Sequence, residues 1–429
     1  MRSEFRHSVL LTLGTGTTAV LSLVYCVYAG RKMGPAGGYA DFTAALAFVS
    51  FFNIALGPIN GTITRFSAQF AAQNRVGAVR TLHTAIARPV ALWALAGFPL
   101  ILLVGPFLAS VFRFHSILLL VLAYGMVYLT LLMSVGRGVL RGVQRFHAYN
   151  ANILTEAGSR LGIGIALFAV VASAAVGLVA YVLAMILTLG LLWGQLRAVW
   201  GDQPAEPMDG AAVVRFVLPM FVLMGTAAGF ENLDLFVVKS CLDEAQAGAY
   251  GAAFILAKAM SVVATPFHIL LLPLLTDLYT RGRGLGGAFV RISLYFVLLA
   301  AGPLLLFWFA GDPIVRRVYG AQFDAAGGVL GPLALARMLT YVAGLITVLY
   351  ASLGRFRFLW FYVTALVAEA GLLARWHGSL EQIVWTVLVV QLVTALGLAV
   401  WLIVDRGAPR PGGPAAGVET PQTTLGGLT

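Results

Sequence analysis

The stretch GFENLDLFVVKSCLDEAQAGAYGAAFILAK, from Gly229 to Lys258, places charged side chains where the surrounding chain is apolar. Glu231 and Asp234 are three residues apart, so on a helix they share one face. Lys258 stands at least one turn inside the next apolar run. A charge at the centre of a membrane costs about 2.5–3.5 kcal/mol on insertion scales, so we expect these groups to face a bundle interior or a wet cavity.

The same stretch contains a short repeat. The tetrapeptide from Ala247 to Tyr250 echoes the one from Ala36 to Tyr39, at a separation close to half of the 429-residue chain. In both copies the tetrapeptide separates two apolar runs. The repeat therefore predicts a duplicated helix bundle whose second half opens with a charged helix.

The composition is that of an integral membrane protein. Hydrophobic residues make up 60% of the chain and charged residues 10%, against about 25% charged in soluble domains. The apolar runs are long and unbroken, so they predict an all-α protein and not a barrel. The net charge of +11 is spread over short loops, which indicates topology and is little evidence for a nucleic-acid partner.

About twelve spans of roughly 20 residues each account for the apolar runs. The chain then divides into an N-terminal lobe (1–200), a cytoplasmic linker (201–212), a C-terminal lobe (213–405) and a disordered cytoplasmic tail (406–429) that is rich in Pro, Gly and Thr. The predicted spans are 8–30, 40–63, 86–111, 115–135, 152–173, 175–196, 213–239, 247–274, 287–310, 327–353, 357–376 and 380–404.

The distribution of basic residues predicts the orientation. Eighteen Lys and Arg residues fall on the side of the N-terminus and seven on the opposite side, while Arg160, Lys258 and Arg337 fall inside spans. This bias places both termini in the cytoplasm. Cys26 and Cys241 have no metal-ligand spacing; we expect two inert thiols, although a bridge between them is left open.

Polar residues form stripes on two of the predicted spans. The stripe on the second span is equally consistent with a role in helix packing. Arg65 is equally consistent with a side chain that snorkels to the membrane interface. Glu156 and Arg160, at i and i+4, predict a structural ion pair near the cytoplasmic end of the fifth span. We favour a role in a central cavity for Lys258 and Arg337. The alternative for Glu231 and Asp234 is that they neutralise these two cations and bind nothing. The stripes comprise Asn53, Gly57, Asn60, Thr64 and Arg65 on the second span, and Arg337, Thr340, Tyr341, Gly344 and Thr347 on the tenth.

No catalytic motif is found in the sequence. It contains no Gly-rich nucleotide loop, no HExxH, no Gly-x-Ser-x-Gly and no Asp-rich metal motif. We therefore predict a protein that is not an enzyme and that uses neither a cofactor nor a metal.

Two motifs resemble those of the polysaccharide transporters, the Wzx-type lipid-linked oligosaccharide flippases of the multidrug/oligosaccharidyl-lipid/polysaccharide (MOP) exporter superfamily. The resemblance covers roughly residues 8–404 and is more diagnostic of superfamily than of substrate. The first motif is Asn232-x-Asp234, leading through an acidic turn into Ala247-Gly248-x-Tyr250. The second is Gly34-x-x-Gly37-x-Tyr39, followed after the second span by Arg65-Phe66.

The resemblance implies a MATE-like, V-shaped bundle of two six-helix lobes that works by alternating access in the bacterial inner membrane. The implied substrate is an undecaprenyl-pyrophosphate-linked oligosaccharide for a surface polysaccharide such as O-antigen or exopolysaccharide, with polymerase and assembly proteins as further partners. A drug/cation antiporter of the same superfamily is the alternative. Arg65, Lys258 and Arg337 would hold the pyrophosphate and Asn53, Asn60 and Tyr341 the sugar, while Glu231 or Asp234 would couple an ion.

Overall fold

The computed structural model describes residues 2–404, except 56, 202, 205, 207–209, 281–284 and 354. Over these ranges the chain is built of helices and contains no strand, which confirms the all-α prediction. The predicted tail, 406–429, lies outside the described residues.

The first half of the chain contains seven helices and one kinked turn. They are α1 (Arg2–Met33), η1 (Pro35–Tyr39), α2 (Ala40–Ala55), α3 (Gly57–Ala72), α4 (Val76–Val111), α5 (Ile117–Gly142), α6 (Phe146–Phe168) and α7 (Ala174–Trp200). The second half contains α8 (Gly210–Cys241), α9 (Glu244–Lys258), α10 (Met260–Thr280), α11 (Gly286–Phe309), α12 (Gly311–Val318), η2 (Ala321–Ala326), α13 (Gly327–Ser352), α14 (Leu359–Arg375) and α15 (Leu380–Val404).

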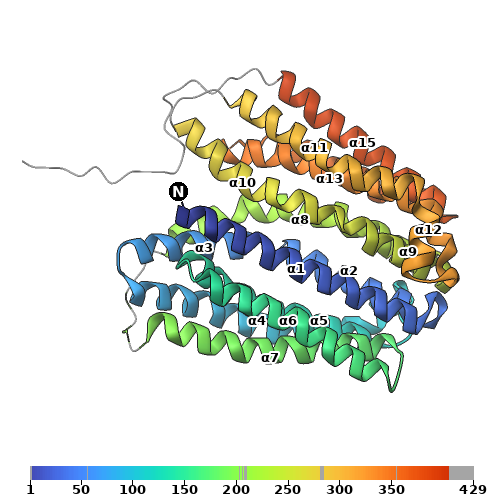
Figure 1. Ribbon diagram of the computed structural model, residues 1–429, viewed down its shortest axis with the longest axis horizontal. Coiled ribbons are helices and arrows are strands. Elements are labelled where there is room, and N and C mark those ends of the chain that lie inside the picture. The colour runs from blue at the N-terminus through green and yellow to red at the C-terminus, as the bar shows by residue number, and fades with distance from the viewer. Residues whose placement is uncertain are drawn as a thin grey trace, which may run out of the picture.

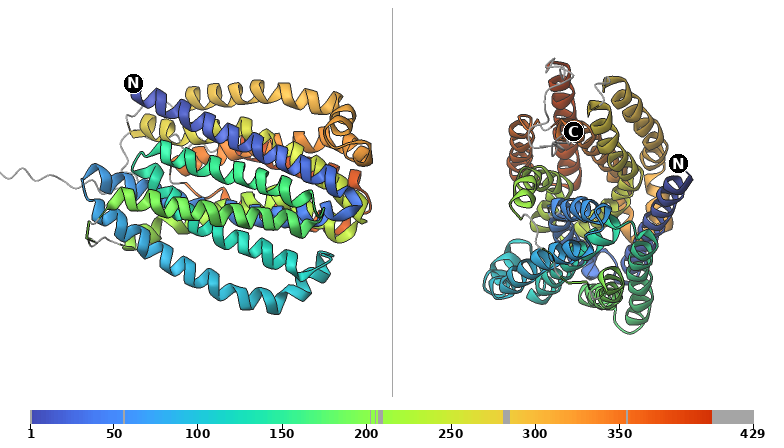
Figure 2. Two further views of the ribbon diagram at one scale, coloured as in Figure 1. Left: turned by 60° about the horizontal axis from the view of Figure 1, so that its bottom comes forward. Right: turned by 90° about the vertical axis from the view of Figure 1, so that its left-hand side faces the viewer.

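The helices gather into two groups that lie side by side (Figure 1). Helices α1–α7 pack mainly against one another and form the N-terminal lobe, and α8–α15 form the C-terminal lobe. Seen from the end, the blue-to-green and yellow-to-red helices occupy opposite halves of the bundle (Figure 2). Helix α2 crosses between them, because it packs on α8 and α9 as well as on α5.

The described helices follow the predicted spans in order, but fewer than twelve of them are long and apolar enough to cross a membrane. Nine are long and apolar enough to cross a membrane, and α2 with α3 forms a further span bent by 41°. Helix α6 carries Glu156 and Arg160, and α14 has only 17 residues. Both pack along full-length neighbours, α7 and α15. The chain is therefore a multi-pass membrane protein, with nine helices among its described residues that could cross a membrane, or ten if the bent pair is one span.

Several helices extend beyond the predicted spans. Helix α4 begins at Val76 and not at 86, α5 continues to Gly142 past 135, and α6 begins at Phe146 and not at 152. Apolar runs mark only the lipid-facing part of a helix, whereas backbone hydrogen bonding continues into its polar end. As a result Arg137 and Arg141, counted with the loop charges from the sequence, lie on α5.

The repeated tetrapeptides adopt different structures and meet at the junction of the lobes. The first copy lies in η1, where Gly38 has φ +96°. The second lies inside α9 and does not separate two helices, because Asp243 caps α9 ahead of it by accepting from the Gln246 backbone N–H. A Cβ at Gly248 would overlap the carbonyl oxygen of Pro35, so glycine there permits close contact between the lobes.

The described part of the linker docks on the turn between α3 and α4. Arg75 Nε lies 3.0 Å from Glu206 Oε2, and Arg80 Nη1 donates to the carbonyl oxygen of Gln203 at 2.8 Å. Gly77, without a side chain, leaves room for Pro204 above it. The linker is thus attached to the N-terminal lobe before α8 begins.

Candidate functional site

A buried ion pair joins α8 and α13 in the C-terminal lobe. Asp234 is fully buried and the side chain of Arg337 is 1% exposed. Arg337 donates to Asp234 Oδ2 and, at 2.7 Å, to the carbonyl oxygen of Phe230. Tyr250 donates its hydroxyl to the same Asp234 oxygen at 2.5 Å. Asp234 is therefore paired with Arg337, as the alternative in which the carboxylates neutralise the cations requires.

Lys258 is the last residue of α9, at the break before α10. Its Nζ donates to Ser50 Oγ on α2 at 2.6 Å and lies 4.0 Å from Glu231 Oε2. The side chains of Lys258 and Glu231 are 26% and 16% exposed. Of the two predicted interior cations in this lobe, Lys258 is therefore the more accessible, and it contacts the opposite lobe.

A third carboxyl group lies near this ion pair. Glu369 on α14 is fully buried, and its Oε2 accepts from Gln391 Nε2 at 2.8 Å. Its other oxygen, Oε1, has no hydrogen-bond partner among the described residues. We define the C-lobe cluster as Glu231, Asp234, Lys258, Arg337 and Glu369. It contains three carboxyl groups and two cations.

The predicted stripe on the second span is divided by the break between α2 and α3. Asn53 is exposed on α2, whereas Asn60 is half-buried on α3 and accepts a hydrogen bond from Arg141 of α5. Arg65 is exposed on α3, with its guanidinium carbon 5.9 Å from the centre of the Phe66 ring. Asn60 thus contributes to helix packing, the structural alternative for this stripe.

Tyr341, on the other predicted stripe, is buried in α13. Its ring meets the imidazole of His268 edge-on, with centroids 6.3 Å apart. The stripe on this helix is therefore directed into the C-terminal lobe, next to Arg337. Substrate binding by these residues stays a prediction.

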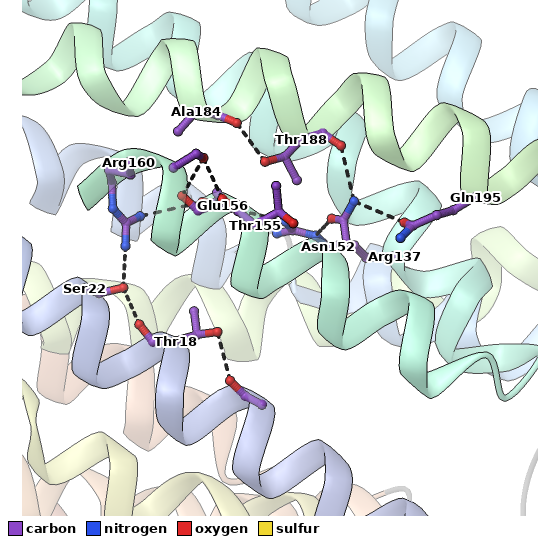
Figure 3. Close-up of polar contacts among 12 residues, drawn as sticks. Thr18, Ser22, Arg137, Asn152, Thr155, Glu156, Arg160, Ala184, Thr188 and Gln195 are labelled. Carbon is purple, nitrogen blue, oxygen red and sulfur yellow. Dashed lines mark hydrogen bonds and ion pairs between the residues drawn. The ribbon is translucent and has the colours of Figure 1, made fainter. Parts of the chain in front are cut away.

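A second charged cluster lies inside the N-terminal lobe (Figure 3). Glu156 on α6 receives a hydrogen bond from Arg137 Nη2 of α5 at 2.7 Å, and its Oε1 lies 3.7 Å from Arg160 Nη1. The predicted Glu156–Arg160 pair is therefore confirmed, but it lies in the middle of α6 and not near the end. We name Arg137, Glu156 and Arg160 the N-lobe cluster.

Polar and aromatic neighbours hold the two guanidinium groups of this cluster. Arg137 Nε donates to Asn152 Oδ1 at 2.8 Å, and Arg160 Nη2 donates to Ser22 Oγ at 2.5 Å (Figure 3). Arg160 also lies 4.3 Å from the centre of the Tyr181 ring, a geometry that stabilises a cation. The Arg160 Nε has no hydrogen-bond partner among the described residues.

The two clusters carry opposite formal charge. The N-lobe cluster has two guanidinium groups and one carboxylate, so it retains one positive charge. The C-lobe cluster retains one negative charge when all its carboxyl groups are ionised. The sequence analysis counted Arg137 with the loop charges and did not predict its place in this cluster, because the apolar run ends before it. The sequence did offer one signal: Arg137 and Arg141 are four residues apart, a spacing that places both on one face if the helix continues through this glycine-rich segment.

Metal binding finds no support in the described residues. No group of three or more His, Cys, Asp or Glu residues there has the geometry to hold a metal ion. Cys26 is buried and Cys241 partly exposed, and both are free thiols.

Comparison with known proteins identifies the fold. No family model and no curated protein matches the chain. Solved structures do match. An inward-facing multidrug resistance MATE family transporter of the MOP superfamily has TM-score 0.72 and 12% identity, over 91% of this chain and 95% of that one. An outward-facing conformation of such a transporter has TM-score 0.65 and 13% identity, over 95% and 96%. The lipid II flippase MurJ in an inward closed conformation has TM-score 0.71 and 11% identity, over 92% and 88%. The chain therefore has the fold of MOP superfamily transporters.

Proposed function

We propose that this protein is a flippase that moves undecaprenyl-pyrophosphate-linked oligosaccharide across the bacterial inner membrane by alternating access. The observation that carries the proposal is the surplus positive charge of the N-lobe cluster. Arg137 and Arg160 share a single carboxylate, Glu156, and the side chains of Arg137 and Glu156 remain 16% and 14% exposed. Charges inside membrane segments are costly, and they mark pathways for substrates or ions.

The chemistry of the cluster fits an anionic head group. Guanidinium groups bind phosphate oxygens through paired, charge-assisted hydrogen bonds. Asn152 and Ser22, beside the two arginines, offer the kind of polar group that binds sugar hydroxyls. Lys258, at the contact between the lobes, and Arg65, exposed on α3, would extend this cationic path, with Asn53 and Asn60 nearby in sequence. The lipid tail would stay in the bilayer.

We infer two energy sources for this movement from the same charges. Moving one negative charge outward across a membrane with an inside-negative potential of 100 mV releases about 2.3 kcal/mol. The surplus carboxyl group of the C-lobe cluster supports a second contribution, a coupled cation acting through Glu231 or Asp234.

A drug/cation antiporter is the second candidate, and the C-lobe cluster is the observation that favours it. Its three carboxyl groups against two cations would suit a cationic cargo. The named neighbours include both a multidrug resistance transporter and a lipid II flippase, so fold similarity does not choose between the two.

The test is translocation of a fluorescent undecaprenyl-pyrophosphate oligosaccharide in proteoliposomes that contain the purified protein. Protection of the head group from an external quencher reports its movement, with and without an imposed potential. We expect protein-dependent movement that increases with potential. No movement, together with uptake of a cationic dye, would favour the antiporter.

A double variant that restores the net charge of the N-lobe cluster makes this test more specific. Arg137→Gln reduces the N-lobe cluster to zero net charge, and we expect at least about a tenfold loss of flipping, the equivalent of one charge-assisted hydrogen bond. Arg137→Gln combined with Glu156→Gln restores one positive charge and should recover much of the activity. Arg145→Gln, an exposed arginine at the start of α6, is the matched control. Equal activity in Arg137→Gln and Arg145→Gln would refute the role of the cluster.

A further inference from the structure

The lobes are joined by polar contacts at the end of the bundle opposite the N-terminus. Arg31 Nε donates to the carbonyl oxygen of Val318 at 2.6 Å, and the hydroxyl groups of Tyr39 and Tyr319 lie 3.0 Å apart. Each contact links the N-terminal lobe to the segment formed by α12 and η2. This end is therefore closed in the structure, which agrees with the higher similarity to the inward-facing transporter.

The centre of this junction is a buried ion pair between the lobes. Asp41 lies in the first turn of α2 and Lys239 in the last turn of α8, and Lys239 Nζ is 2.7 Å from Asp41 Oδ1. The side chains are only 4% and 2% exposed. Opening this end would transfer both charges to water and break the pair.

An exposed histidine completes the junction. His115 lies in the turn between α4 and α5, and its side chain is 62% exposed. Its Nδ1 is 2.7 Å from Asp41 Oδ2, and its Nε2 is 3.6 Å from Glu244 Oε2 on α9. Glu244 Oε1 also accepts from the Gly38 backbone N–H at 3.1 Å. One imidazole thus faces carboxylates from both lobes.

The surroundings of His115 are open to solvent and mixed in charge. A depression of about 190 Å³ lies beside it, lined by Arg113, His115, Lys239, Leu242, Asp243, Glu244 and Ala247. The charged groups at this junction are Asp41 from α2, Lys239 from α8, Asp243 and Glu244 at the start of α9, and Arg113 from its own turn. Three are acidic and two are basic, so a third positive charge would balance the site.

We propose that His115 is a proton-binding site that holds the two lobes closed at this end. A protonated imidazole donates from Nδ1 to Asp41 within its own lobe, and its positive charge lies 3.6 Å from Glu244 Oε2 across the junction. A neutral imidazole has only one N–H and presents a lone pair to the other carboxylate. Protonation therefore stabilises the closed form, and loss of the proton removes the positive charge that attracts both carboxylates.

The inference rests on the alternating access of the proposed function but not on the identity of the cargo. The predicted orientation, with both termini in the cytoplasm, would put this end of the bundle on the external side. The proton that binds His115 would then come from the external side of the membrane, and its binding would favour the inward-facing form.

The experiment measures the distance between the lobes directly and needs no substrate. Spin labels are attached at Ala172→Cys, in the exposed turn between α6 and α7, and at Ala374→Cys, in the last turn of α14, after Cys26→Ala and Cys241→Ala. Distance distributions are recorded in nanodiscs at pH 5.5 and pH 8. Because partly exposed ion pairs are weak, we expect the ratio of closed to open forms to fall about two- to fivefold at pH 8.

Three variants decide whether His115 is responsible. His115→Gln should abolish the pH response, and Glu244→Gln, which keeps an acceptor for Gly38, should reduce it. His377→Gln, at the same end but bonded to the carbonyl oxygen of Leu373, should respond like the parent protein. A parent protein that does not respond to pH, or a response that survives in His115→Gln, would overturn the proposal while leaving the proposed cargo untouched.

Discussion

The buried pair between Arg337 and Asp234 allows a structural role to be separated from a role in transport. Arg337→Met leaves a fully buried carboxylate whose remaining donor among the described residues is the Tyr250 hydroxyl. Removing one partner of a buried ion pair typically costs about 3–5 kcal/mol, because the other charge stays buried without compensation. Arg337→Met combined with Asp234→Asn removes that charge and keeps an acceptor for Tyr250. We expect the double variant to recover at least about 2 kcal/mol of the loss.

The measurement is a double-mutant cycle. The parent protein, both single variants and the double variant are unfolded by SDS titration from dodecylmaltoside, with tryptophan fluorescence as the signal, and flipping is assayed in parallel. A stable double variant that flips substrate normally would assign Arg337 to the scaffold, and a stable but inactive one would support the predicted substrate site. If Arg337→Met alone is as stable as the parent, the reasoning about the buried charge is refuted.

Two further predictions concern the lobe junction and the cysteines. Gly248→Val should lower the melting temperature or open the junction, because its side chain meets the backbone of Pro35 and overpacking costs about 1–3 kcal/mol. Gly225→Ala, a helical glycine with free space around it, is the control and should melt at or above the parent temperature. Cys26 and Cys241 should run as free thiols on a non-reducing gel, with maleimide reacting faster at the partly exposed Cys241; a mobility shift reversed by reductant would contradict this.

The sequence predicts contacts that lie within one helix better than contacts between helices. Apolar runs predicted the helices that could cross a membrane, because lipid requires a continuous apolar surface. The i, i+4 spacing of Glu156 and Arg160 predicted their pair. Arg137 joins that pair from another helix, and no local pattern encodes the contact. Asp41 and Lys239 come from opposite halves of the chain, and only the packing of α2 on α8 brings them together. The periodicity of the sequence therefore could not predict the polar junction between the two lobes.

The docked linker limits how far the lobes can separate at the N-terminal end. Glu206 is held by Arg75, and α8 begins at Gly210. The intervening chain reaches at most about 15 Å, at 3.8 Å for each Cα–Cα link. A docked linker would therefore restrain the start of α8. In the proposed alternating access, the width of the inward opening would depend on whether the linker stays docked. Because the Arg75–Glu206 pair is well exposed, high salt weakens it, and ionic strength on this side would then set the largest head group that can enter.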